Sequence, residues 1–162
     1  IRRGTLTAKE RDIINYHIVS TIRMLEQVPW PKHLKNVAEY AGGHHERMDG
    51  RGYPKGLTRH QMSVQARMLG IADIFEALTA VDRPYKQGMK VSKALEIMVR
   101  FKKNGHIDPD LFDVFMREGV YKRYALQFLD ADQIDVPTDA VHHEPRLDEV
   151  VPAPVESSET PA

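Results

Sequence analysis

The spacing of apolar residues along the chain predicts helices. A capping box, in which Thr7 is followed by Glu10, opens a helix that we expect to run to about Gln27. His17 lies at the edge of its buried stripe, and the Pro-Trp-Pro at residues 29–31 ends the helix. The buried stripe comprises Ile14, Ile18, Ile22 and Leu25.

A second and a third helix are predicted on either side of a glycine-rich loop. We expect the second over residues 32–46, with His44 and His45 on its inner side, and the loop over residues 49–58. The third, over residues 63–80, has an apolar stripe on one side and small residues on the other, so we expect it to be buried on two faces at the centre of a bundle. The apolar stripe is Val64, Met68, Ile71, Phe75 and Leu78, and the small stripe is Ala66, Gly70, Asp73 and Ala77.

Three shorter helices and a tail complete the expected fold. A fourth helix is predicted over residues 92–101, a fifth begins at an Asp108-Pro109 cap and is ended by Gly119, and a sixth covers residues 121–129. Five of the ten prolines lie in residues 131–162, which predicts a disordered, acidic tail. With no strand expected, the fold class is all-α, with one domain up to residue 130. The core residues expected on the fourth helix are Leu95, Met98 and Val99.

The composition narrows the chemistry. The chain has no cysteine, so any metal must be held by histidine and carboxylate, which favours iron, manganese, zinc or nickel over an iron–sulfur cluster. Basic and acidic residues balance at 23 each, but residues from 132 onward hold eight acids and one base. The rest of the chain is therefore basic, which suits an anionic substrate or reflects solubilising charge. No apolar run approaches ~18 residues, so we expect a cytoplasmic protein without membrane contact in this segment.

Three histidines and one aspartate are candidate metal ligands. Neighbours on a helix point about 100° apart, so His44 and His45 would serve two adjacent ions, or one would ligate while the other orients a partner. Two solvated histidines at a helix end are the alternative. His17 is either a ligand or a satisfied core residue. Asp73, among small residues, needs a compensating charge, which a metal or an ion pair with Arg67 or Arg83 would provide.

Phosphate recognition is the second chemistry that the residues suggest. The loop places the Tyr53 hydroxyl and backbone N–H groups just after the histidines, where an anion would be cradled, unless the loop is only a tight turn. Arg83 and Lys86 suit phosphate because arginine forks onto two oxygens and lysine supplies a point charge. Their alternative is a solvated turn after the third helix.

The chain resembles the HD-GYP family, a branch of the HD-domain metal-dependent phosphohydrolases. Residues 44–54, HHERMDGRGYP, resemble the family's signature, and residues 71–79 and 83–86 resemble its later blocks. Residues 6–17 resemble the segment before the signature. The resemblance covers roughly residues 4–120, and the signature is highly specific.

The resemblance implies an HD-domain-like helical bundle with two or three divalent metal ions, often iron or manganese. It implies hydrolysis of the bacterial second messenger cyclic di-GMP to pGpG or GMP, with cyclic di-GMP synthase (GGDEF) proteins or a second copy of the chain as partners, and no DNA or RNA polymer. By position it implies metal ligands at His17, His44, His45 and Asp73, of which the last three are catalytic, and phosphate contacts at Tyr53, Arg83 and Lys86.

Two departures from the family pattern stand out. Ile18 replaces the proline that usually follows the first histidine, and the His-Asp pair that names the superfamily is not found in residues 1–162. In the family that pair lies upstream of the segment matching residues 6–7, so we expect residues 1–162 alone to bind metal weakly and to be inactive. The alternative functions are a degenerate, non-catalytic module that binds nucleotide or signalling proteins, and a relative acting on another cyclic dinucleotide.

Overall fold

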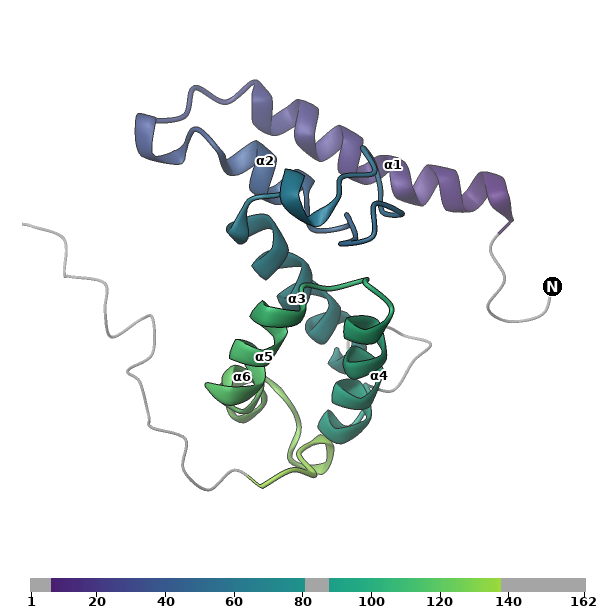
Figure 1. The fold of residues 1–162 in the computed structure, drawn as a ribbon, viewed down its shortest axis with the longest axis vertical. Coiled ribbons are helices and arrows are strands. Elements are labelled where there is room, and N and C mark those ends of the chain that lie inside the picture. Colours follow the sequence, from purple (N-terminus) through teal and green to yellow (C-terminus); the bar gives the residue numbers. More distant parts are fainter. Residues whose placement is uncertain (1–6, 81–87, 138–162) are drawn as a thin grey trace, which may run out of the picture.

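A computed structural model of the chain describes residues 7–80 and 88–137. In these ranges it is all-α, as predicted: α1 and α2 lie side by side, α3 runs from them, and α4, α5 and α6 surround its far end (Figure 1). No helix of the described ranges has the length and apolar character needed to cross a membrane. The helices are α1 (Ala8–Glu26), α2 (Val37–Gly42), α3 (Val64–Thr79), α4 (Val91–Lys103), α5 (Pro109–Arg117) and α6 (Val120–Phe128), and the 3₁₀ helices are η1 (Lys32–Leu34), η2 (Arg59–Gln61) and η3 (Ala131–Gln133).

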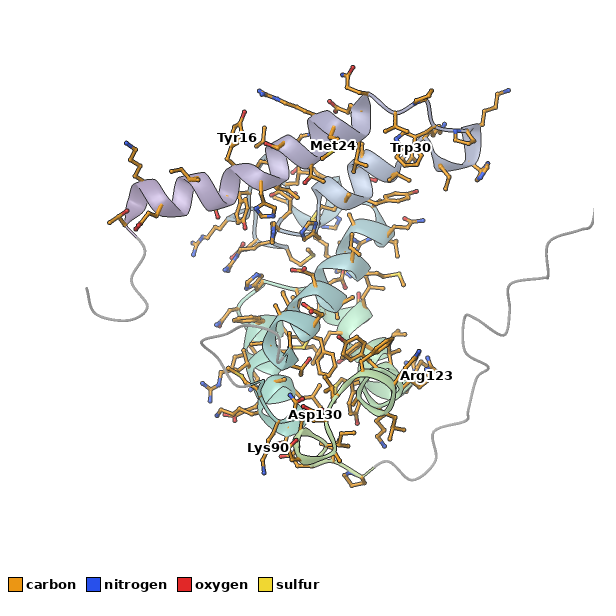
Figure 2. The ribbon with its side chains drawn as sticks, turned by 180° about the vertical axis from the view of Figure 1, so that it is seen from behind. Tyr16, Met24, Trp30, Lys90, Arg123 and Asp130 are labelled. Carbon is orange, nitrogen blue, oxygen red and sulfur yellow. The ribbon has the colours of Figure 1, made fainter. Side chains whose placement is uncertain are left out.

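The limits of α1 are those that the sequence predicts. The Thr7 hydroxyl accepts a hydrogen bond from the Glu10 backbone N–H, and the Glu10 carboxylate accepts one from the Thr7 N–H, so the capping box is confirmed. The inner side of α1 buries Ile18 completely. Its outer side carries Tyr16 and Met24, which project away from α2 and are more than half exposed (Figure 2).

The second helix differs from the prediction. Instead of one helix over residues 32–46, the chain forms η1 and then the short α2, which ends at Gly42. The helix ends at two glycines, which are poor helix formers, and they allow close packing: a side chain at Gly42 would lie 2.7 Å from Ile22 of α1, and one at Gly43 would lie 2.8 Å from Ala66 of α3. His44 and His45 therefore follow the helix in a turn.

Helix α3 forms where predicted, with the Ser63 hydroxyl capping it through the Ala66 N–H. Ile71 and Phe75 of its apolar stripe are buried, but Val64 and Met68 are 46% and 55% exposed, so the expectation of two fully buried faces is wrong for the first turns. On the small-residue side, Gly43 packs on Ala66 and the His44 backbone packs on Gly70.

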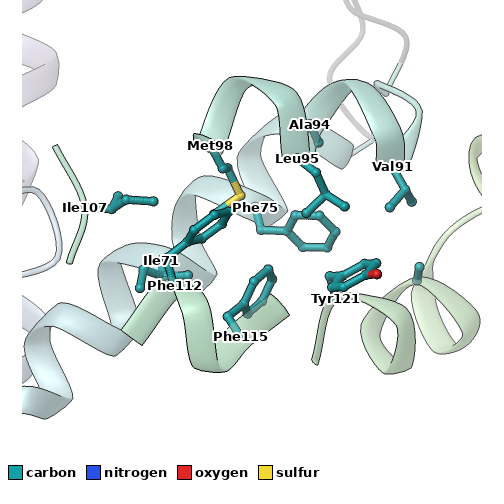
Figure 3. Packing of buried hydrophobic residues seen from close by; sticks show 11 residues of the cluster. Ile71, Phe75, Val91, Ala94, Leu95, Met98, Ile107, Phe112, Phe115 and Tyr121 are labelled. Atoms are coloured by element: carbon teal, nitrogen blue, oxygen red, sulfur yellow. The ribbon is translucent and has the colours of Figure 1, made fainter. Parts of the chain in front are cut away.

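The core surrounds Phe75 of α3. Phe115 of α5 meets it edge to face at 5.4 Å between ring centroids, and Met98 of α4 and Tyr121 of α6 close the cluster (Figure 3). Leu95 and Met98 are buried as predicted, whereas Val99 is 37% exposed because it lies on the outer side of α4.

The folded region extends beyond the expected boundary at residue 130. Gln133 is buried, and its side-chain amide donates hydrogen bonds to the backbone oxygens of Thr79 (2.8 Å) and Met89 (3.0 Å). The Asp135 carboxylate accepts from the Ser92 N–H and hydroxyl at the start of α4. The prediction of a disordered tail is therefore wrong for residues 131–137, since these side chains satisfy buried backbone groups. Residues 138–162 lie outside the described ranges.

A buried carboxylate joins three elements beside the core. Asp108 caps α5 through the N–H groups of Asp110 and Leu111, as predicted, and its side chain is completely buried. It also accepts hydrogen bonds from Arg59 of η2, at 2.8 Å, and from Arg67 of α3. These two guanidinium groups neutralise a charge that is otherwise costly to bury.

We expect Asp108→Ala to lower the free energy of unfolding by about 3–5 kcal/mol, because two arginines and a helix N-terminus lose their partner. Asp110→Ala is the matched control, since Asp110 pairs with the same Arg59 but is 75% exposed, and should cost less than about 1 kcal/mol. Urea unfolding at neutral pH measures both. Equal losses in the two variants would contradict the role given to burial.

The same carboxylate predicts a pH dependence. Burial alone would raise the pKa of Asp108, but the hydrogen bonds from Arg59, the Leu111 N–H and Arg67 outweigh it and hold the pKa below its ordinary value. The unfolded chain therefore binds the proton first, so the contribution to stability is complete above the ordinary carboxyl pKa of about 3.9 and is lost as pH falls below it. We expect the difference in unfolding free energy between the unaltered protein and Asp108→Asn to shrink from about pH 6 to about pH 3.

Candidate metal centre

Three histidines from two elements converge. His17 lies on α1, and His44 and His45 lie in the turn after α2; one ring nitrogen of each lies within 4.8 Å of the others. This spacing would allow the three side chains to bind one metal ion, and we call them the histidine cluster. The Nε2 atoms of His17 and His45 are 3.2 Å apart. The expectation that adjacent histidines point apart fails because the turn brings the His44 and His45 ring centroids to 4.1 Å.

The orientation of His44 is fixed by the backbone. Its Nδ1 lies 2.6 Å from the Ala41 carbonyl oxygen, so in the tautomer that donates this hydrogen bond Nε2 carries the free lone pair. A backbone carbonyl on one ring nitrogen is the usual partner of a metal-ligating histidine. Gly70 of α3 lies against the same turn, where a side chain would come within 3.0 Å of the His44 carbonyl oxygen.

The electrostatics of the cluster keep His45 neutral. Burial, with the neighbouring His44 and His17, lowers the pKa of His45 to about 4, although the negative charge of Asp73 opposes the shift. At neutral pH the ring therefore offers a lone pair rather than a positive charge. This is the protonation state that metal binding requires.

Asp73 lies beside the histidine cluster. It is partly buried on α3, its charge acts on His45 and Tyr53, and it lines a cavity together with His44. Its carboxylate is not within the 4.8 Å grouping of the three histidines, as far as the described residues go. The predicted alternative, an ion pair with Arg67, is wrong, because Arg67 binds Asp108.

The glycine-rich loop places Tyr53 against the histidine cluster. Its ring stacks on His45 at 4.8 Å between centroids, and its N–H donates to the His45 carbonyl oxygen at 3.3 Å. Burial and the Asp73 charge raise the pKa of Tyr53, so its hydroxyl remains a hydrogen-bond donor. Arg83 and Lys86 lie outside the described residues, and their contact with phosphate stays a prediction.

Glu46 is a residue of the site that the sequence reasoning missed. It is 4% exposed, and its two carboxylate oxygens accept hydrogen bonds from the N–H groups of Lys55 (2.7 Å) and Leu57 (2.9 Å). Gly52 allows the loop to lie directly on it, since a side chain there would come within 2.4 Å of the Glu46 Cα. A carboxylate between two histidines and a glycine-rich loop was the available signal.

The other side of the loop is tied to the junction between α4 and α5. The Asp49 N–H donates to the Gly105 oxygen at 3.0 Å, and the Arg47 guanidinium binds the Asp49 carboxylate and holds its pKa below the usual range. The loop that carries Tyr53 is thus fixed from two directions.

The donor set fits a divalent metal ion. Three imidazole nitrogens close together, with a carboxylate beside them and one ring already oriented by a carbonyl, are ligands that iron, manganese or zinc accept. The neutral state of His45 agrees with this use.

Comparisons with known proteins point the same way. A family model described as HD domain matches residues 1–111. A cyclic di-GMP phosphodiesterase of Pseudomonas aeruginosa is 37% identical over 134 residues, which cover 82% of this chain and 31% of the relative. A 3'3'-cGAMP-specific phosphodiesterase of Vibrio cholerae is 43% identical over 81 residues (50% and 19%), and a cyclic di-GMP phosphodiesterase of Thermotoga maritima is 30% identical over 131 residues (73% and 34%). The chain spans about a third or less of these relatives' own lengths.

We expect Glu46→Gln to loosen the loop, because the amide nitrogen that replaces one oxygen cannot accept the hydrogen bond it loses. Hydrogen exchange at the Lys55 and Leu57 amides should accelerate by about tenfold or more. Glu39→Gln is the control, since the exposed Glu39 carboxylate accepts hydrogen bonds from Ser63 and none from the loop amides of Lys55 and Leu57 that the structure describes. Unchanged exchange at both loop amides would show that Glu46 does not hold the loop.

Proposed function

The chain belongs to the HD-domain family, in its HD-GYP branch, and from this we propose that it forms part of a metal-dependent phosphodiesterase of cyclic dinucleotides. The observation that carries the proposal is the convergence of the histidine cluster from α1 and the turn after α2. Phosphodiester hydrolysis fits a site with imidazole ligands, a nearby carboxylate and a phenol donor. The names of the relatives support a cyclic dinucleotide as the substrate.

The histidine cluster and Asp73 are the residues that would hold metal. In more detail, we propose that these residues hold two or three ions of iron or manganese. A divalent ion held there would supply Lewis acidity and positive charge at the reacting phosphate. The Ala41 carbonyl oxygen fixes the His44 ring for this role, and the low pKa of His45 leaves its lone pair available at neutral pH.

The remaining residues would bind and orient the phosphate. The Tyr53 hydroxyl, protonated and held against His45 by stacking, is suited to donate a hydrogen bond to a phosphate oxygen as negative charge develops. Arg83 and Lys86 are proposed to bind the phosphates from the segment after α3. A donor that is held in place, as Tyr53 is, lowers the barrier because it need not rearrange during the reaction.

Cyclic di-GMP is the proposed substrate, and pGpG or GMP the product. Relatives named for cyclic di-GMP match 82% and 73% of this chain, and relatives named as 3'3'-cGAMP-specific phosphodiesterases match 50%, 67% and 70% of it. The 37% identity to the Pseudomonas aeruginosa cyclic di-GMP phosphodiesterase over 82% of the chain supports cyclic di-GMP. A role in bacterial second-messenger signalling follows from that substrate.

We expect His45→Ala or Asp73→Ala to abolish turnover of cyclic di-GMP by the full-length protein without unfolding it. The expected loss of turnover exceeds about 100-fold. Mutation of residues that only hydrogen-bond to metal ligands already lowers metal affinity or activity by about 10–100-fold. His60→Ala is the control, because His60 is exposed on η2 and is not part of the histidine cluster. Turnover, bound metal and circular dichroism are measured together. Retained activity in either variant would remove the metal-site argument.

A further inference from the structure

A cavity of about 450 Å³ opens beside the histidine cluster. It lies between α3 on one side and α5 and α6 on the other, three helices that neighbour one another in Figure 1. His44 and Asp73 line it, so the cavity is continuous with the candidate metal centre. Its volume is within the roughly 300–1,000 Å³ of small-molecule sites.

The inner wall of the cavity is aromatic. Phe75 meets Phe115 at 5.4 Å and Tyr124 at 5.6 Å between ring centroids, both in edge-to-face arrangement (Figure 3 shows the first pair). Phe75 and Phe115 are buried in the core (2% and 9% exposed), so they leave little ring face for a ligand and instead hold the partly buried Tyr124 in place. Tyr124 is the ring of this wall that a flat, unsaturated ligand would contact.

A carboxylate lies at the same cavity. Glu76 follows Asp73 by three residues, so both carboxylates project from neighbouring positions on α3 into the cavity lining. Within residues 7–80 and 88–137, no hydrogen bond or ion pair occupies the Glu76 side chain, which is exposed to solvent. Its two oxygens are acceptors only, so they match a ligand edge that presents two adjacent N–H donors.

We propose that this cavity binds a guanine base of the substrate, with the base against the aromatic wall and its Watson–Crick edge on Glu76. The inference rests on the proposed function, which brings a phosphodiester to the adjacent histidine cluster. Guanine presents N1–H and N2–H side by side, and a carboxylate accepts from both. Adenine instead presents N1, a hydrogen-bond acceptor, beside its amino group, and the lone pair of N1 is repelled by a carboxylate. Glu76 would therefore select guanine over adenine.

The test is Glu76→Gln in the full-length, metal-loaded protein. We expect kcat/KM for cyclic di-GMP to fall about tenfold or more relative to that for bis(p-nitrophenyl) phosphate, which has no purine. The preference for cyclic di-GMP over cyclic di-AMP should shrink as well, because a glutamine amide both donates and accepts and so tolerates adenine. Glu26→Gln, at the exposed end of α1, is the control and should change neither ratio.

A second variant examines the aromatic wall. Tyr124→Leu keeps the wall apolar but removes the ring, so the KM for cyclic di-GMP should rise while kcat for bis(p-nitrophenyl) phosphate changes less. Unchanged ratios in both variants would overturn the guanine site and indicate that another polypeptide segment covers the cavity. Equal losses for both substrates would also overturn it, since Glu76 would then act on the metal centre.

The two proposals fail in different ways. If the unaltered protein hydrolyses neither substrate, the phosphodiesterase proposal fails. Equilibrium binding of cyclic di-GMP and cyclic di-AMP to the unaltered protein and to Glu76→Gln then decides the guanine site. Loss of the guanine preference in the variant would support it, and equal preference would overturn it.

Discussion

Backbone contacts that leave no room for a side chain determine where the three histidines lie. Gly42 packs on Ile22, Gly43 on Ala66, and Gly70 on the backbone of His44, so α1, α2 and α3 approach one another more closely than larger residues would allow. The approach ends α2 early and turns the chain over α3. His17 then faces a turn rather than a helix, and two adjacent rings can reach a common point.

Two buried carboxylates stabilise the region that this packing creates. Glu46 holds the loop that carries Tyr53 through backbone N–H groups, and Asp108 ties η2 and α3 to the start of α5 through two arginines. Each charge is offset locally, one by amides and the other by guanidinium groups, so neither is an isolated ion in the core. The site is thus supported by polar contacts on one side and by the aromatic core around Phe75 on the other.

The sequence predicted what short-range chemistry determines. The capping box of α1, the Asp108 cap and the helical class follow from residues within four positions of one another, and all are present. The early end of α2, the exposure of Val64 and the ordering of residues 131–137 depend on contacts between distant segments. The motif identified the three histidines, but their convergence required the turn. Glu46 was overlooked because its partners are backbone amides, so the sequence marks it only by its place between the two histidines and the glycine-rich loop.

The side-chain amide of Gln133 links segments that are far apart in the sequence. By binding the carbonyl oxygens of Thr79 and Met89 together, it holds the two anchor points of the segment that carries Arg83 and Lys86. The entropy of bringing those anchor points together is then lost on folding. Changes after α6 that remove this amide would therefore loosen the link between the end of α3 and the residues before α4 without touching the histidine cluster.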